Sequence, residues 1–160
     1  MTDFALARAL HVLAVVLWIG GVGMVTTVLL PQIRRDLPPE ARLPAFHRLE
    51  RRFSAQARLT TLLAGASGFY MTWRLDGWGR FGIVDFWWMH AMVGLWLVFT
   101  LMLFVAEPLF LDRWLARRAA AAPEATYRLV SWLHIVLLAA GLLTIAGAVA
   151  GSAGSDLFDW

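Results

Sequence analysis

The chain has 160 residues, of which 60% are hydrophobic and only 16% are charged, against roughly one quarter charged residues in a soluble domain. The absence of cysteine excludes disulfides, thiolate metal sites and cysteine nucleophiles. The net charge of +3 does not indicate nucleic acid as a partner, because the arginines that carry it lie beside apolar runs, as signals of membrane topology do.

Four apolar runs are long enough to cross a hydrocarbon layer of about 30 Å. They cover residues 4–30, 57–73, 84–110 and 127–151. The first run is closed by Pro31 and is too long for the core of a signal peptide, so we expect a retained helix. The sequence therefore predicts one all-α domain over residues 1–160, a bundle of four transmembrane helices in contact with the lipid bilayer.

The arginines set the expected orientation of these spans. Most of them lie between the first and second spans or between the third and fourth: Arg34, Arg35, Arg42, Arg48, Arg51, Arg52, Arg58, Arg113, Arg117, Arg118 and Arg128. The opposite side has only Arg8, Arg74 and Arg80. Because positive residues stay in the cytoplasm, both termini are predicted to face outward, into the periplasm of a bacterium whose inner membrane holds the chain.

The segments between and within the spans carry further signals. Residues 38–58 are charged and predict a solvated extension of the second helix. The outer loop, residues 76–82, is rich in glycine, and the tryptophans near it predict an outer aromatic belt: Trp73, Trp78, Trp87 and Trp88. Small residues spaced for close helix contacts are Ala64 with Gly68 and Gly147 with Gly151.

Two histidines are expected at matched depth in the outer half of the membrane. His11 lies about 10 Å below the outer end of the first span, and His90 lies at a similar depth in the third, at 1.5 Å per residue. Ionisable residues inside a membrane are costly, which makes them candidates for function. Two imidazoles at one level predict a shared metal or haem, whereas the structural alternative is an imidazole bonded to a backbone carbonyl or a hydroxyl of another helix.

Haem b requires axial imidazoles, a flat apolar slot and cations for its propionates. Trp18 extends the His11 face of the first helix, while Gly94 and Leu97 extend the His90 face of the third. Arg8, one turn above His11, and Arg74, at the outer end of the second span, are the candidates for the propionates. Copper is the alternative metal, and Met71 is then the expected soft ligand.

The remaining ionisable groups are expected elsewhere. His134 falls in the inner half of the fourth span, where a structural hydrogen bond is the first expectation, and a proton relay or second site is the alternative. His47 is expected to be solvated. Pro108 is expected to end or kink the third helix, with Glu107 paired to a loop arginine.

Several short motifs resemble known families. The segments Ala9-Leu10-His11-Val12 and Leu17-Trp18-Ile19-Gly20-Gly21 resemble the first helix of the CopD (copper-resistance D) family and of the HemJ-type protoporphyrinogen oxidases. The segments Glu50-Arg51-Arg52-Phe53 and Ala66-Ser67-Gly68-Phe69-Tyr70 are similar to their second helix. The HemJ resemblance implies haem b near the histidine of the first helix and a lysine early in the third. Here the chain has no lysine, and His90 stands at the comparable place.

Three functions remain open from the sequence. The first is a haem b protein that transfers electrons or oxidises a substrate at the outer leaflet, with a redox partner or quinone. The second is a copper-binding transport or resistance protein, as the CopD resemblance implies. The third is an accessory membrane subunit without cofactor. Each is compatible with a homo-oligomer.

Overall fold

The computed structural model describes residues 2–153, which form helices joined by short connections, with no strand among them. The main helices are α1 (Thr2–Met24), α2 (Leu30–Asp36), α3 (Pro39–Arg74), α4 (Trp87–Leu101), α5 (Asp112–Ala121) and α6 (Pro123–Ser152). The expected position of the C-terminus concerns residues 154–160, which lie outside the described residues. The predicted all-helical class is confirmed.

Three helical stretches are long and apolar enough to cross a membrane by length and composition. They are Asp3–Asp36, Val84–Ala121 and Pro123–Ser152, with 34, 38 and 30 residues. The predicted first, third and fourth spans lie within them. Each is longer than the roughly 20 residues that a crossing needs.

The second predicted span lies in α3, which is not among these three stretches. Its apolar part is short and contains three fully or largely buried hydroxyl residues, Thr60, Thr61 and Ser67. The helix packs against α1, α4 and α6, so these hydroxyls face protein rather than solvent. The face of α3 that packs on other helices carries these hydroxyls, while Leu59, Leu62 and Trp73 are exposed on its other side, so only part of this helix is apolar.

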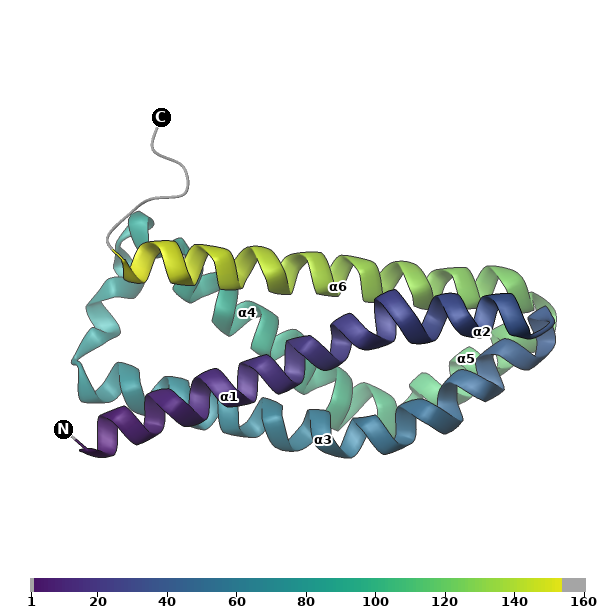
Figure 1. Cartoon of the computed structure of the whole chain (residues 1–160), viewed down its shortest axis with the longest axis horizontal. Helices are drawn as coiled ribbons and strands as arrows, with labels where there is room; N and C mark the ends of the chain where they lie inside the picture. Colours follow the sequence, from purple (N-terminus) through teal and green to yellow (C-terminus); the bar gives the residue numbers. More distant parts are fainter. Residues whose placement is uncertain (1, 154–160) are drawn as a thin grey trace.

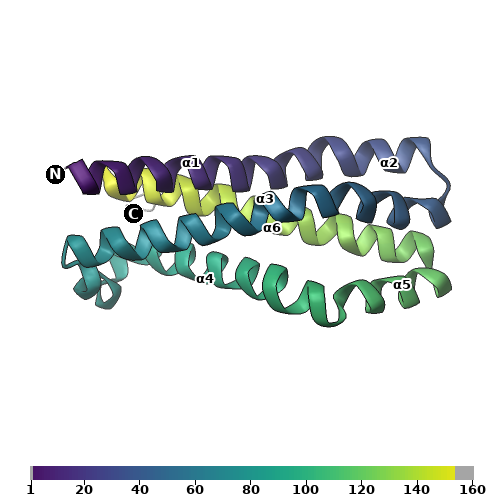
Figure 2. The ribbon, with the colours of Figure 1, turned by 90° about the horizontal axis from the view of Figure 1, so that it is seen from below.

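The helices form a four-cornered bundle (Figures 1 and 2). α1 with α2 and α4 with α5 lie at diagonal corners, and α3 and α6 fill the other two. The beginning of α1 and the end of α6 lie at one end, which we call the N-terminal end (Figure 1). The opposite end, where residues 36–39 and 121–123 connect the helices, is called the arginine-rich end.

The helical path continues past two prolines, each of which lies in or just after a π-helical segment. η1 (Val25–Leu29) precedes Pro31, and the Leu30 N–H bonds the carbonyl of Val25, five residues back. η4 (Met102–Leu111) contains Pro108 and runs on into α5. A π turn shifts the backbone ladder by one residue, which lets the helix pass a residue that lacks an N–H. Pro31 therefore does not close the first helix, and the third helix is distorted at Pro108 rather than ended there.

Tryptophan rings of α4 pack directly against the backbone of glycines in α6 and α3. A Cβ on Gly147 would collide with Trp87, and one on Gly151 would collide with Trp88. The ring of Trp96 occupies the space beside Gly65, where a Cβ would likewise collide with it. The rings of Trp87 and Trp88 are half-buried against α6, because bare backbone allows a large ring to approach closely, and their place in an outer aromatic belt stays a prediction.

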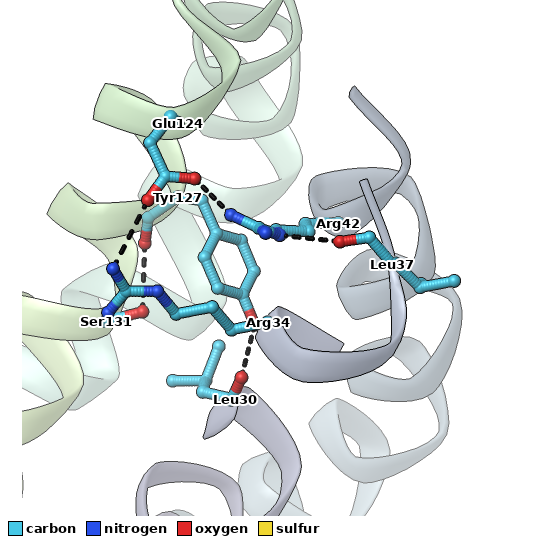
Figure 3. A network of polar contacts seen from close by, with 7 residues as sticks. All are labelled: Leu30, Arg34, Leu37, Arg42, Glu124, Tyr127 and Ser131. Carbon is cyan, nitrogen blue, oxygen red and sulfur yellow. Dashed lines mark hydrogen bonds and ion pairs between the residues drawn. The ribbon is translucent and has the colours of Figure 1, made fainter. Parts of the chain in front are cut away.

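A polar network joins three helices at the arginine-rich end (Figure 3). Glu124, in the first turn of α6, forms ion pairs with Arg42 of α3 and, at 3.5 Å, with Arg34 of α2. The hydroxyl of Tyr127 donates a hydrogen bond of 2.8 Å to the carbonyl of Leu30. The extension of α3 is therefore helical as predicted, but it is not simply solvated, because Phe46 is buried against this cluster.

Candidate functional site

His11 lies on the face of α1 that packs against α3. The residues that share its stripe, Ala7, Ala14 and Trp18, are buried. Its Nδ1 lies 2.9 Å from the carbonyl oxygen of Ala64 and 3.1 Å from the hydroxyl of Ser67. The ring therefore has a fixed orientation, held by two groups of one neighbouring helix.

The hydrogen bonds assign the tautomer of His11. The Ser67 hydroxyl donates to the carbonyl of Leu63 in its own helix, so it cannot also donate to His11. The Nδ1 of His11 then carries the proton and donates it to Ala64. This leaves a lone pair on Nε2, which has no hydrogen bond among residues 2–153. A histidine held through Nδ1–H to a carbonyl is the usual arrangement of an imidazole that binds a metal through Nε2.

Gly68 makes room for the His11 ring. A Cβ added to Gly68 would lie 3.2 Å from the ring carbon Cε1, closer than ordinary packing. The Ala64–Gly68 pair predicted to allow close helix contact thus receives an imidazole. The site is built on two helices, which hold side chains more rigidly than loops do.

His90 occupies a different position from the one expected. Its ring is exposed and packs edge-on against Phe81, with 5.2 Å between ring centroids. The residues on the same stripe of α4 are also exposed: Gly94, Leu97, Val98 and Leu101. α1 and α4 stand at diagonal corners of the bundle (Figure 2), and the ring of His11 is held by α3 whereas that of His90 packs on Phe81. Ligation of one metal by both histidines stays a prediction.

Trp18 belongs to the core. It is 4% exposed, and its ring meets Phe99 of α4 edge-on, with centroids 4.9 Å apart. Side-chain packing therefore occupies the ring face that was expected to line a cofactor slot. The indole N–H of Trp18 has no hydrogen-bond partner among the described residues.

Arg8 and Arg74 are brought together. They line one groove at the N-terminal end, with a volume of about 810 Å³, between α1 and the end of α3. Arg74 forms an ion pair of 3.2 Å with Asp3, which also accepts a hydrogen bond of 2.8 Å from Tyr70. His11 does not line this groove, since its ring turns towards α3.

Met71 lies on the face of α3 that packs against α1. It stands three residues after Gly68 and seven after Ala64, so helix periodicity places it on the same face. The side chain is half-buried. Because α1 and α3 run in opposite directions, Met71 lies about one turn beyond His11 towards the N-terminal end.

The other histidines take structural positions. Nδ1 of His134 lies 2.9 Å from the carbonyl oxygen of Val130, one turn back in α6, and the ring meets Phe46 edge-on at 5.5 Å. This is the structural role expected first, while a relay or second site stays a prediction. His47 is half-buried rather than solvated, and its Nε2 has no partner among the described residues.

A second polar site was missed by the sequence reasoning. The Ser54 hydroxyl lies 3.0 and 3.1 Å from the two carboxylate oxygens of Glu107 and can donate to them. Arg58 forms an ion pair of 3.3 Å with Glu107. The pairing of Glu107 with an arginine was expected, but the partner lies in α3. The spacing of Ser54 and Arg58, four residues apart on one helix face, is the sequence signal that could have found it.

Arg58 also completes the π-helical segment η4. In a π-helix the N–H of residue 108 would bond the carbonyl of residue 103, but Pro108 has no N–H. The Nε of Arg58 donates a hydrogen bond of 3.2 Å to the carbonyl of Leu103 instead. One arginine thus satisfies both the carbonyl freed by Pro108 and the carboxylate beside it.

These groups line a polar hollow of about 410 Å³, together with Arg51 and Asp112. Glu50 lies on the same face of α3, one turn before Ser54. Burial, together with the nearby negative charges of Glu107 and Asp112, raises the pKa of Glu50 to about 7. Glu50, beside the hollow rather than in its lining, can therefore hold a proton near neutral pH.

The raised pKa of Glu50 predicts a pH-dependent stability. The folded protein keeps the proton up to about pH 7, whereas the unfolded chain releases it near the ordinary value of 4.5. The free energy of unfolding should therefore fall as the pH rises from about 4.5 to about 7 and be flat above. Glu50→Gln should flatten this slope in denaturation midpoints measured between pH 4 and 8. Glu40→Gln, at an exposed carboxylate of the same helix, is the control; a slope unchanged by Glu50→Gln would contradict the assignment.

The fold and its sites define an all-helical protein with three helices able to cross a membrane, an anchored histidine in α1 and a polar hollow at the other end. Residues 2–153 contain no group of three or more His, Asp or Glu side chains placed to hold a metal ion. No family model, curated protein or solved structure matches the chain.

Proposed function

We propose that the chain crosses a bacterial inner membrane four times, with both termini on the periplasmic side. Three apolar helices support this proposal, and the apolar part of α3 among them supplies the fourth crossing. The arginines gather at one end of the bundle, which the positive-inside rule assigns to the cytoplasm.

Reporter fusions test this topology. A reporter that is active only in the periplasm should work when fused after Trp160 and fail when inserted in the connection between α5 and α6. A reporter active only in the cytoplasm should give the reverse pattern. Strong cytoplasmic activity after Trp160 would refute the proposed topology: a cytoplasmic α5–α6 connection would then indicate three crossings, and a periplasmic one an inverted bundle.

We further propose that the protein binds haem b in the outer half of the membrane through Nε2 of His11. The observation that supports this most is the anchored imidazole, with its proton on Nδ1 and an unpartnered nitrogen on the other side. A neutral imidazole with a fixed ring fits an axial haem ligand. The resemblance of the first helix to the CopD and HemJ-type families agrees with a haem at this histidine.

The residues fit a haem with one protein ligand better than one with two. His11 offers a bundle-facing ring, whereas His90 lies on an exposed stripe of the diagonal helix. When bound, haem b supplies one-electron redox chemistry, which is the basis for an electron-transfer or oxidoreductase role. Ala64 and Ser67 orient the His11 ring and hold its proton on Nδ1, and Gly68 leaves the ring its space.

Copper is the second candidate, and the position of Met71 favours it. This thioether shares the α1-facing stripe of α3 with the residues that hold His11, about one turn away. An imidazole and a thioether suit Cu(I), which prefers soft ligands. The corresponding function is copper transport or resistance.

An absorption spectrum and a metal analysis of the detergent-purified protein separate the candidates. Haem b is expected to give a Soret band with α and β bands on reduction, and ligation by one imidazole should give a high-spin ferric signal in electron paramagnetic resonance. Copper without a Soret band would favour the second candidate. The cells should be supplied with haem precursor and copper. If the purified protein then shows neither signal, the result would favour an accessory membrane subunit without cofactor.

A further inference from the structure

The groove at the N-terminal end combines an apolar floor with two arginines. Its lining comes from one face of α1 and the end of α3: Phe4, Ala5, Arg8, Ala9, Val12, Leu13, Arg74 and Leu75. Two alanines among larger side chains leave a hollow along α1. Its volume of about 810 Å³ lies within the range of sites that take small molecules.

The charges in the groove are not balanced. Arg74 is paired with Asp3. Arg8 is exposed and forms no ion pair within residues 2–153. The unpaired cation stands beside an otherwise apolar surface that continues through Val12 and Leu13 towards the middle of the bundle. A ligand that complements this groove has a negative group at one end and a hydrocarbon chain at the other.

We infer that this groove binds one anionic phospholipid, with its phosphate between Arg8 and Arg74 and an acyl chain along Val12 and Leu13. Arginine pairs with phosphate through two parallel hydrogen bonds, which suits it to this headgroup. If the proposed topology holds, this lipid belongs to the outer leaflet. The binding of the lipid does not depend on that topology.

The haem propionates are the competing anion at these arginines. The geometry favours the lipid, because the proposed haem ligand does not line the groove. The His11 ring is held towards Ala64 and Ser67 of α3, on a different face of α1 from the one that carries Val12 and Leu13. A haem held by His11 and a lipid in the groove therefore occupy different faces of one helix.

Native mass spectrometry of the purified full-length protein, with added phosphatidylglycerol or phosphatidylcholine, tests this inference. We expect one phosphatidylglycerol to be retained at least tenfold more tightly than phosphatidylcholine. Arg8→Gln should abolish that preference. Ala9→Leu, which fills the groove and keeps both arginines, should reduce the binding of both lipids. Arg128→Gln removes the same charge from an exposed position on α6 and should leave the preference unchanged.

Three results would overturn the inference. Equal retention of the two lipids would show that the arginines do not select the headgroup. If Arg8→Gln and Arg128→Gln reduced the preference for phosphatidylglycerol equally, the protein would attract this lipid by its net charge alone. A loss of haem with Arg8→Gln while lipid binding persists would assign the arginines to the propionates. Because lipid retention is measured in detergent and haem by its spectrum, failure of the lipid site is distinguishable from failure of the topology or of the haem proposal.

Discussion

His11→Ala is expected to lower the haem content of the purified protein by more than about tenfold, because it removes the axial nitrogen that bonds the iron. Ser67→Ala should have a smaller effect, up to about tenfold, since Ala64 still accepts the Nδ1 proton and only one of two orienting contacts is lost. The Soret absorbance per mole of protein measures both changes. Helical circular dichroism shows whether each variant folds.

His90→Ala is the matched control for His11→Ala. Since the His90 ring is exposed and packs on Phe81, its loss should leave the haem spectrum unchanged. Loss of haem in both variants would instead establish bis-imidazole ligation and require α4 to turn its exposed stripe towards α1. A native spectrum in His11→Ala would end the proposal that this histidine binds haem.

Arg58→Ala is expected to destabilise the folded protein by about 1–3 kcal/mol, since it leaves Glu107 and the carbonyl of Leu103 without their charged donor. The side chain of Arg58 is 38% exposed, so water can replace part of the lost interaction. Denaturant titration followed by circular dichroism in detergent measures the change. Arg117→Ala, at an exposed arginine of α5, should cost less than about 0.5 kcal/mol.

A double-mutant cycle with Pro108 tests the reason for this effect. Pro108→Ala restores an N–H that can donate to the carbonyl of Leu103 within the π-helical segment. The cost of Arg58→Ala should therefore be about 1 kcal/mol smaller when Pro108 is already alanine. Additive effects of the two substitutions would show that Arg58 does not replace the missing N–H of Pro108.

The partner of Glu107 in the polar hollow could not be predicted from the sequence. The sequence predicted an arginine partner but not which one, because eleven arginines lie near the expected cytoplasmic side. The partner was decided by the packing of α3 against η4, which places Arg58 beside Pro108. Ion pairs between helices depend on which faces meet, and helix periodicity alone fixes only the neighbours within one helix.

The sequence by itself determined that this protein is helical and that three stretches are apolar enough to cross a membrane, since hydrocarbon thickness and backbone hydrogen bonding leave no other choice for such runs. Tertiary structure decided which histidine faces the bundle. His11 and His90 lie at similar expected depth, but depth follows from counting residues, whereas direction follows from how each helix is rotated against its neighbours. That rotation is set by contacts far apart in sequence, among them Trp87 on Gly147 and His11 on Gly68, which turn His11 towards α3 and leave His90 exposed.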